Sequence, residues 1–418
     1  MSYSKQKDIP EKTLLRLLAA LQFTHIVDFM IIMPLGPKLM RDLNVTPGQF
    51  GMLVSAYTVA AGIAGFFSSF WIDRFSRKLA LLVSYAGFIA GTILCSLSTS
   101  FFMLIFARGL AGIFGGILAG MIITIIGDAI PAQRRGKAMG TIMSAFSLAA
   151  IVGVPLGLKA ADWLGWNFSF ELVSGLSLFF WILCFRLLPP LKDHLKVKTT
   201  NENPLAKIRD LVKTSNLHYA IFYMVILMFG QFSVIPYISP VLVQNAHLPE
   251  NKLFLMYFIG GSVTVISSPL IGKLADAWGK PSTFVLLTIL SCTAIYLITN
   301  VQPMPLFILF SITAWFFITI SGRIIPSMAM ITEMVPPQKR GNFMGIVGAS
   351  RQLASGLAAF IASRIVSKTP QGMISHYHIV GYIAILASLL ALLFLKKLKP
   401  AQLAPIEEAI GYDILQED

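Results

Sequence analysis

Twelve long apolar stretches constrain this chain more than any other feature of its sequence. They lie near residues 14–37, 50–72, 79–97, 100–126, 138–160, 168–188, 217–241, 253–274, 282–299, 304–331, 342–366 and 377–395. A helix needs about 20 apolar residues to cross roughly 30 Å of hydrocarbon. The stretches are too long for barrel strands, whereas a helix satisfies its own backbone polar groups in lipid. We therefore predict an all-α membrane protein with twelve transmembrane helices.

The composition supports a membrane location. Of the 418 residues, 56% are hydrophobic and 12% are charged, whereas a soluble domain carries about 25% charged residues. A nucleic-acid-binding protein gathers its basic residues on one folded face. Here the net charge of +14 comes from short clusters between apolar runs, as membrane topology requires. We expect a multi-pass protein of the cell inner (plasma) membrane that contacts lipid and does not bind nucleic acid.

The chain shows no sign of enzyme chemistry. Cys95, Cys184 and Cys292 lie inside apolar runs, and their spacing fits neither a metal site nor a disulfide framework. The sequence contains no HExxH motif, no phosphate-binding glycine loop and no recognisable catalytic triad. We predict that the protein is not an enzyme and that it uses no cofactor and no metal.

Basic residues are distributed unevenly among the connections. The even-numbered connections contain Arg74, Arg77, Lys78, Arg134, Arg135, Lys137, Lys273, Lys280, Lys339 and Arg340. Connections 98–100 and 300–303 contain none, although Lys38 and Arg41 lie in an odd-numbered one. The positive-inside rule therefore places both termini in the cytoplasm. The expected organisation is a six-helix bundle (1–188), a polar cytoplasmic linker (189–216), a second six-helix bundle (217–396) and a cytoplasmic tail (397–418).

The two bundles repeat each other at a nearly constant offset. A shift of 203 residues places Phe29 on Phe232, Asp28 on Gln231, Pro37 on Pro240 and Asp73 on Asp276. This common offset indicates duplicated halves, which in transporters flank a central binding site.

Two copies of one loop pattern follow spans 2 and 8. The first copy runs from Ser69 through Asp73 to Lys78, and the second from Gly272 through Asp276 to Lys280. They resemble the loop signature of the major facilitator superfamily, which has a glycine, an acid four residues later and then a basic cluster. The first copy has serines in place of both glycines, and the second has fewer basic residues. The resemblance extends over about residues 14–396.

This resemblance implies two pseudo-symmetric six-helix halves and a gate at the cytoplasmic ends of the helices. By the resemblance, Asp73, Arg77 and Asp276 are candidate gate residues. An acid at a helix end also faces the partial positive charge of a neighbouring helix N-terminus. The alternative is that the basic residues only set the topology. Members of the family mostly function as monomers, so we expect a monomer.

Motifs in spans 1, 4 and 5 indicate which branch of the superfamily the chain resembles. In span 4, Arg108 is followed by Gly112, Gly116 and Gly120, and this spacing of small residues permits close helix packing. Residues 153–157 resemble the Gly/Pro motif of exporters in the superfamily. Together with residues 28–37, they look most like the twelve-span proton-coupled drug and sugar efflux branch.

Four charged residues lie well inside the spans. They are Asp28, Arg108, Arg323 and Arg351, and each costs about 2.5–3.5 kcal/mol at the bilayer centre unless it faces a cavity or a partner. An acid in such a cavity is suited to load and release a proton, so Asp28 is the candidate proton carrier. His25, one helical turn earlier, is a candidate relay. The alternative is a permanent Asp28–Arg108 pair that only joins two helices.

Polar residues in the second half are candidates for substrate contact, as is Arg108. Arg323 and Arg351 lie at similar depth, and two guanidinium groups suit an anion. Alternatively, they bond to backbone carbonyls or extend toward water. Gln231 is placed to hydrogen-bond a polar solute such as a sugar. Asp128 and Glu333, near the ends of spans 4 and 10, are expected to pair with loop bases.

We therefore predict a secondary active transporter that exchanges a small organic solute for protons and exports it by alternating access. One alternative is uptake, or an uncoupled carrier for an organic anion or a sugar. The other is a membrane receptor or scaffold that transports nothing.

Overall fold

A computed structural model describes residues 9–68, 70–192, 195, 217–335 and 340–398. Within these residues, twelve spans are long and apolar enough to cross a membrane. They are Glu11–Ile31, Pro47–Ser68, Arg77–Ser96, Phe101–Ala129, Arg135–Leu164, Trp166–Leu187, Leu217–Gln244, Glu250–Trp278, Lys280–Thr299, Leu306–Glu333, Phe343–Ile365 and Tyr377–Lys397. Each span matches a predicted stretch to within six residues at either end. Nearly all of the predicted tail and most of the predicted linker lie outside the described residues.

In the first half, two helices begin with a serine cap. The elements of this half are α1 (Glu11–Ile31), α2 (Gly36–Asp42), α3 (Pro47–Ser68), η1 (Ile72–Arg74), α4 (Arg77–Ser96), α5 (Phe101–Ala129), η2 (Ala132–Arg134), α6 (Arg135–Leu148), the π-turn η3 (Ala149–Gly153), α7 (Val154–Leu164) and α8 (Trp166–Leu187). The hydroxyl of Ser76 accepts a hydrogen bond from the backbone N–H of Leu79, and Ser100 does the same for Met103. These caps satisfy backbone donors that the first turns of α4 and α5 leave free.

The second half repeats this plan and adds a short hairpin. Its elements are α10 (Leu217–Val234), η5 (Ile235–Tyr237), α11 (Ile238–Gln244), η6 (Glu250–Lys252), α12 (Leu253–Trp278), α13 (Lys280–Thr299), α14 (Leu306–Gly322), α15 (Ile324–Glu333), α16 (Arg340–Ile365) and α17 (Tyr377–Phe394). Between α16 and α17, β1 (Ser367–Lys368) pairs antiparallel with β2 (Ile374–Ser375).

Prolines interrupt several spans that the sequence predicted as continuous. The first span ends at Ile31 and not near residue 37, because Pro34 has no N–H to continue the helix. Pro155, Pro236 and Pro326 lie at the breaks in spans 5, 7 and 10. The breaks in spans 1 and 7 occupy related places in the two halves, as the repeat predicts.

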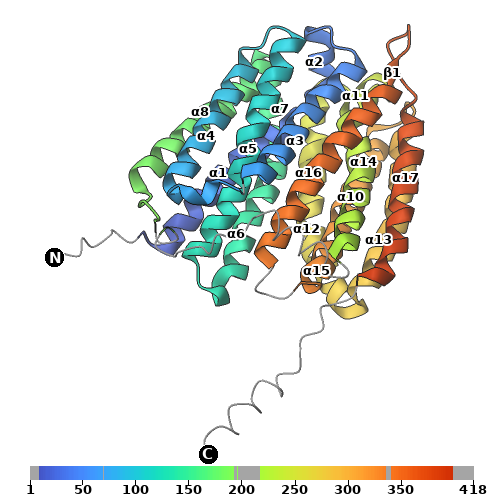
Figure 1. Ribbon diagram of the computed structural model, residues 1–418. Coiled ribbons are helices and arrows are strands. Elements are labelled where there is room, and N and C mark those ends of the chain that lie inside the picture. The colour runs from blue at the N-terminus through green and yellow to red at the C-terminus, as the bar shows by residue number, and fades with distance from the viewer. Residues whose placement is uncertain (1–8, 69, 193–194, 196–216, 336–339, 399–418) are drawn as a thin grey trace, which may run out of the picture.

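The two halves lie side by side, with α1 to α8 in blue to green and α10 to α17 in yellow-green to red (Figure 1). The described chain begins and ends at one face, here called the termini face. The opposite face carries α2, α11 and the hairpin, and is called the far face. Between the halves, α3 packs against α16, and α12 packs against η3 and α7. Each half thus presents spans 2 and 5, or their repeats 8 and 11, to the other.

The halves are closed against each other at the far face. A Cβ on Gly36 would lie 2.9 Å from Pro240, and one on Gly48 would lie 2.9 Å from the carbonyl oxygen of Ser363. Such distances leave no space between α2 and α11, or between α3 and α16.

Contact between α3 and α16 continues along the helices and then stops. Gly62 still packs on Leu353. Gly348 and Gly345 lie further toward the termini face on α16, and a Cβ on either would have no atom within 4 Å. The halves therefore separate toward the termini face.

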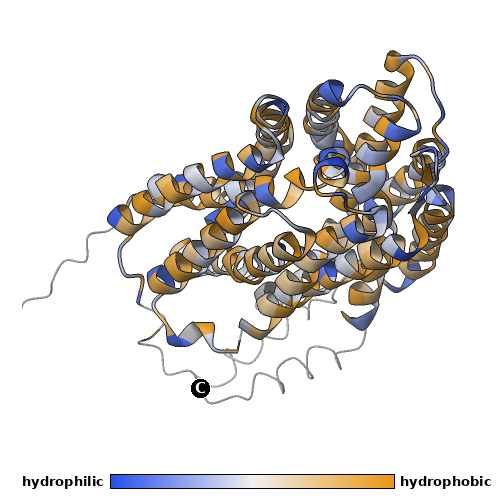
Figure 2. Ribbon diagram, turned by 90° about the horizontal axis from the view of Figure 1, so that it is seen from above, coloured by the Kyte–Doolittle hydropathy of each residue, from blue (hydrophilic) through white to orange (hydrophobic). Residues whose placement is uncertain are grey.

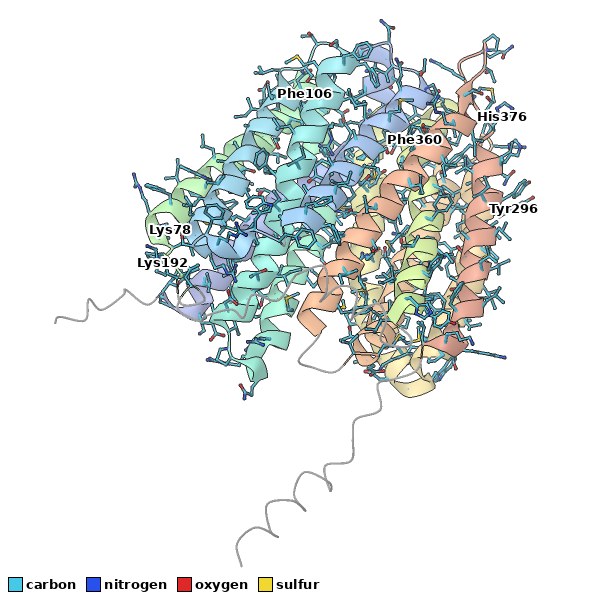
Figure 3. All side chains as sticks on the ribbon, viewed as in Figure 1. Lys78, Phe106, Lys192, Tyr296, Phe360 and His376 are labelled. Atoms are coloured by element: carbon cyan, nitrogen blue, oxygen red, sulfur yellow. The ribbon has the colours of Figure 1, made fainter. Side chains whose placement is uncertain are left out.

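The outer surface of the bundle is apolar. Figure 2 shows mostly hydrophobic ribbon around the helices. Phe106 and Tyr296 lie on the outside of the first and second half (Figure 3), with 67% and 50% of their surface exposed. Trp163 and Phe307 are more than 70% exposed. A surface of this kind suits lipid and not water.

Candidate functional site

The first half contains a fully buried ion pair between α1 and α5. Arg108 Nη1 lies 2.9 Å from Asp28 Oδ2, and both side chains are 0% exposed. Thr92 of α4 places its hydroxyl 3.1 Å from the other carboxylate oxygen. The sequence predicted both charges, and the structure brings them together as the interhelical pair considered above.

The guanidinium group of Arg108 has hydrogen-bonding capacity left over. Its carbon lies 4.3 Å from the ring centre of Tyr57, and cations are attracted to such a ring face. Its Nε and Nη2 have no hydrogen-bond partner among the described residues, and neither does the Tyr57 hydroxyl. Since unsatisfied buried donors are rare in proteins, this cluster is suited to receive a ligand or water.

His25 belongs to the same cluster. Its side chain is 6% exposed, and neither ring nitrogen has a partner within the described part of the chain. Its ring centre lies 5.6 Å from that of Phe88 and 6.4 Å from that of Tyr57. His25 is therefore near Tyr57 without bonding to it, and neither of its nitrogens bonds to another described residue.

Glycines of α5 allow the cluster to form. A Cβ on Gly112 or Gly116 would lie closer than 3.0 Å to backbone atoms of α3. A Cβ on Gly115, which the sequence analysis did not single out, would lie 2.6 Å from the Tyr57 hydroxyl. Gly120 has no such neighbour, so the predicted glycine series ends at Gly116. This contact brings Tyr57 of α3 over the guanidinium group of α5.

The repeat axis passes beside the cluster. The rings of Phe29 and Phe232 lie 6.0 Å apart, and the two residues are related by the 203-residue shift. Residues related by a twofold repeat meet only near the axis. Asp28 and Gln231 are each one position before these rings. Gln231 is 8% exposed, and its Oε1 has no partner among the described residues.

The two arginines of the second half have different surroundings. Arg323 is 0% exposed, and its Nη1 donates hydrogen bonds to Ser291 of α13 and Ser388 of α17. Arg351 of α16 is partly buried, and its Nη1 lies 3.8 Å from the sulfur of Met328. The described contacts join neither arginine to the other, so a shared anion site remains a prediction.

The charges expected at the ends of spans 4 and 10 form one ion pair in each half. Arg77 Nε lies 2.7 Å from Asp128 Oδ2, and Lys280 pairs with Glu333. The predicted pairing of these acids with loop bases is confirmed. Asp276 is exposed and borders the same small cavity of about 330 Å³ as Lys280 and Glu333. The side chain of Asp73 lies outside the described residues.

A second group of charges joins the two halves at the far face. Lys38 Nζ lies 3.0 Å from Asp162 and 3.9 Å from Glu250. Arg41 Nη1 lies 2.6 Å from Glu250. In the sequence, Lys38 and Arg41 stand out only as exceptions to the charge asymmetry. Nothing in the sequence near Glu250 marks it as their partner, because more than 200 residues separate them.

Comparison with known families identifies the architecture. The sequence profile of the Major Facilitator Superfamily matches residues 18–324 and 255–411. The chain belongs to this superfamily. It is therefore a multi-pass membrane transporter for small molecules and not an enzyme.

Relatives of this transporter carry compatible names. It is 29% identical over 293 residues to "Uncharacterized MFS-type transporter YwfA" of Bacillus subtilis (strain 168), covering 67% of this chain and 69% of that protein. It is 26% identical over 367 residues to "Probable sugar efflux transporter" of Helicobacter pylori (strain G27), covering 85% and 87%.

Solved structures share the fold of this transporter. A D-xylose-proton symporter superposes with a TM-score of 0.72 at 18% identity, covering 94% of this chain and 99% of that one. The nucleoside transporter NupG gives 0.69 at 13% identity, covering 93% and 100%. The predicted fold of twelve helices in two pseudo-symmetric halves is confirmed.

Proposed function

We propose that this transporter exports a small organic solute in exchange for protons across the inner membrane, with its termini face in the cytoplasm. It acts as a monomer that opens alternately to the two sides. The observation that supports proton coupling is the buried Asp28–Arg108 pair with unused donors beside it. The drug and sugar efflux branch of the superfamily fits this proposal.

Protonation of Asp28 changes the state of the whole cluster. When Asp28 is ionised, it neutralises Arg108 at 2.9 Å. When Asp28 takes up a proton, Arg108 is left as an unpaired buried charge, which is strongly unfavourable. The cluster must then admit water or an anionic or polar group, and His25 and Tyr57 lie beside the guanidinium group to bind it or pass the proton. In this way the protonation state of Asp28 is linked to what the cluster binds, as coupled transport requires.

A neutral polar solute such as a sugar suits this site best. Gln231 lies next to the repeat axis with a free carbonyl oxygen, and an aromatic pair, Phe29 and Phe232, lies beside it. The efflux relatives of Helicobacter pylori are named for sugars. One proton crossing 100 mV supplies about 2.3 kcal/mol, which sustains roughly a fifty-fold gradient of a neutral solute.

The proposal is tested with purified protein in liposomes that contain a pH-sensitive dye. A panel of sugars, organic anions and lipophilic cations is added in turn to the wild type, Asp28→Asn and Glu11→Gln. Glu11 pairs with Arg134 at the termini face and serves as a matched acid outside the cluster. We expect one solute class to produce a pH change in the wild type and Glu11→Gln, and none in Asp28→Asn.

Other outcomes would select an alternative. Uptake of a solute without a pH change, undiminished in Asp28→Asn, would identify an uncoupled carrier. Equal pH changes in all three proteins would place the proton on a residue other than Asp28.

A further inference from the structure

A second buried cation lies in the second half, and no acid among the described residues pairs with it. Arg323 is at the break between α14 and α15, where Pro326 cannot donate to the carbonyl of Gly322. The Arg323 side chain is 0% exposed. It forms no ion pair with any carboxylate in the described part of the chain.

Two serine hydroxyls near Arg323 accept hydrogen bonds from one of its nitrogens. Ser291 donates to the carbonyl oxygen of Thr288 and Ser388 to that of Ala384, at 2.8 Å each. Both hydroxyls are therefore free to act as acceptors for Arg323 Nη1, at 3.1 and 2.8 Å. This arrangement uses both protons of Nη1.

Three N–H groups of Arg323 remain unused. Its Nε and Nη2 are buried and have no partner among the described residues. The hydroxyl of Thr288 is also buried without a partner there. Thr288 lies three residues before Ser291 on α13, so the two side chains share a helix face. Since Ser291 contacts Arg323, the Thr288 hydroxyl lies on the face of α13 that packs toward Arg323.

The positive charge of Arg323 determines which ligand can bind beside it. Serine hydroxyls and water satisfy hydrogen bonds, but they do not neutralise a cation in surroundings of low polarity. A buried charge is strongly destabilising without an opposite charge. The Asp28–Arg108 pair solves this problem in the first half, whereas the second half has no described acid in the equivalent role.

We propose that Arg323, with Thr288, Ser291 and Ser388, forms a binding site for one small monovalent anion of the size of chloride. Arg323 Nε and Nη2 and the Thr288 hydroxyl donate hydrogen bonds to the anion. The side chains of the site come from α13, α17 and the junction of α14 with α15, all within the second half. It therefore holds the second half together and is separate from the site for the exported solute.

The test is a chloride titration of the purified protein, with thermal unfolding as the measurement. Chloride replaces gluconate at constant ionic strength, and acetate replaces gluconate in a parallel series. We expect chloride to raise the Tm of the wild type in a saturable way, by at least about 2 °C. We expect Arg323→Gln to lose this response. Arg364→Gln, at an exposed position near the end of α16, should keep it.

Thr288→Val keeps the arginine and tests the site even where Arg323→Gln does not fold. We expect it to raise the chloride concentration at half-maximal effect by roughly three- to tenfold. Equal Tm values in chloride and gluconate for the wild type would overturn the proposal, as would an unchanged midpoint in Thr288→Val. A response to acetate but not to chloride would also overturn it, because it would indicate a site for carboxylate solutes. Since the measurement is stability and not transport, its result is independent of proton coupling.

Discussion

At the scale of single residues, the buried pair of Asp28 and Arg108 has an energetic consequence that can be measured. Each charge is fully buried, and each is compensated by the other at 2.9 Å. Removing one partner of a buried ion pair typically costs about 3–5 kcal/mol, because the other charge is left alone. Removing both costs much less.

We therefore predict that Arg108→Gln and Asp28→Asn each lower the Tm of the purified protein more than the double variant does. Thermal unfolding of the four proteins forms a double-mutant cycle. A double variant whose loss equals the sum of the two single losses would contradict an energetic coupling between the residues.

The sequence predicted Asp28, Arg108 and His25 of this cluster, but not its hydroxyl residues. Asp28 and Arg108 stand out because a charge within an apolar run is costly. Thr92 and Tyr57 do not stand out, since hydroxyl residues are common in membrane helices and commonly bond to their own backbone. Their roles depend on which helix faces meet, and that information is not local.

At the scale of helices, the contact between α3 and α5 depends on missing side chains. A Cβ on Gly116 would overlap backbone atoms of Ala61, whereas one on Gly120 would meet no atom within 4 Å. Overpacking at a tight contact costs about 1–3 kcal/mol. In an open helical position, alanine is more favourable than glycine by about 0.5–1 kcal/mol.

We predict that Gly116→Ala lowers the Tm and reduces transport, while Gly120→Ala leaves the Tm unchanged or slightly higher. Thermal unfolding of both variants beside the wild type checks this contrast. Equal effects of the two substitutions would show that the glycine contact is not what holds α5 against α3.

The spans themselves were predictable because hydropathy is a property of each segment alone. The breaks within the spans were not predictable, although the prolines at these breaks are visible in the sequence. Pro269 lies inside α12 without ending it, whereas Pro34 ends α1. Neighbouring helices decide whether the freed carbonyl finds a partner, so proline alone does not mark a break in a membrane helix.

At the scale of the whole molecule, the structure is closed at the far face and separates toward the termini face. Glu250 of the second half pairs with Lys38 and Arg41 of the first, and so fastens the closed end. The hydrogen bond with Glu250 raises the pKa of Arg41, so the pairing favours the charged guanidinium group. Opening of the far face must break these pairs.

We predict that Glu250→Gln shifts the population toward a far-face-open state. Ser55 of α3 is buried against the carbonyl of Gly356, so a cysteine placed there reports separation of the halves. With the three native cysteines replaced, we expect maleimide labelling to be about two- to fivefold faster in Glu250→Gln. Asp42→Asn is the control, because Asp42 contacts Arg41 within the same half. Equal labelling in all three backgrounds would rule out a latch at Glu250.

The repeat was the part of the sequence that predicted the whole molecule best. One offset of 203 residues relates Phe29 to Phe232, and the structure places their rings 6.0 Å apart, next to Asp28 in the sequence. It did not predict the far-face latch, because Lys38, Arg41 and Glu250 are not related by the repeat. A sequence repeat cannot predict contacts between residues that the repeat does not relate.

The most direct test of Asp28 as the proton carrier measures solute exchange and proton-driven accumulation separately. Liposomes containing wild type or Asp28→Asn are assayed for solute exchange at equal pH on both sides, and then for accumulation driven by a pH gradient. If Asp28 carries the proton, the variant retains exchange and loses accumulation. If the variant accumulates solute as the wild type does, Asp28 is not the proton carrier and the buried pair is only structural.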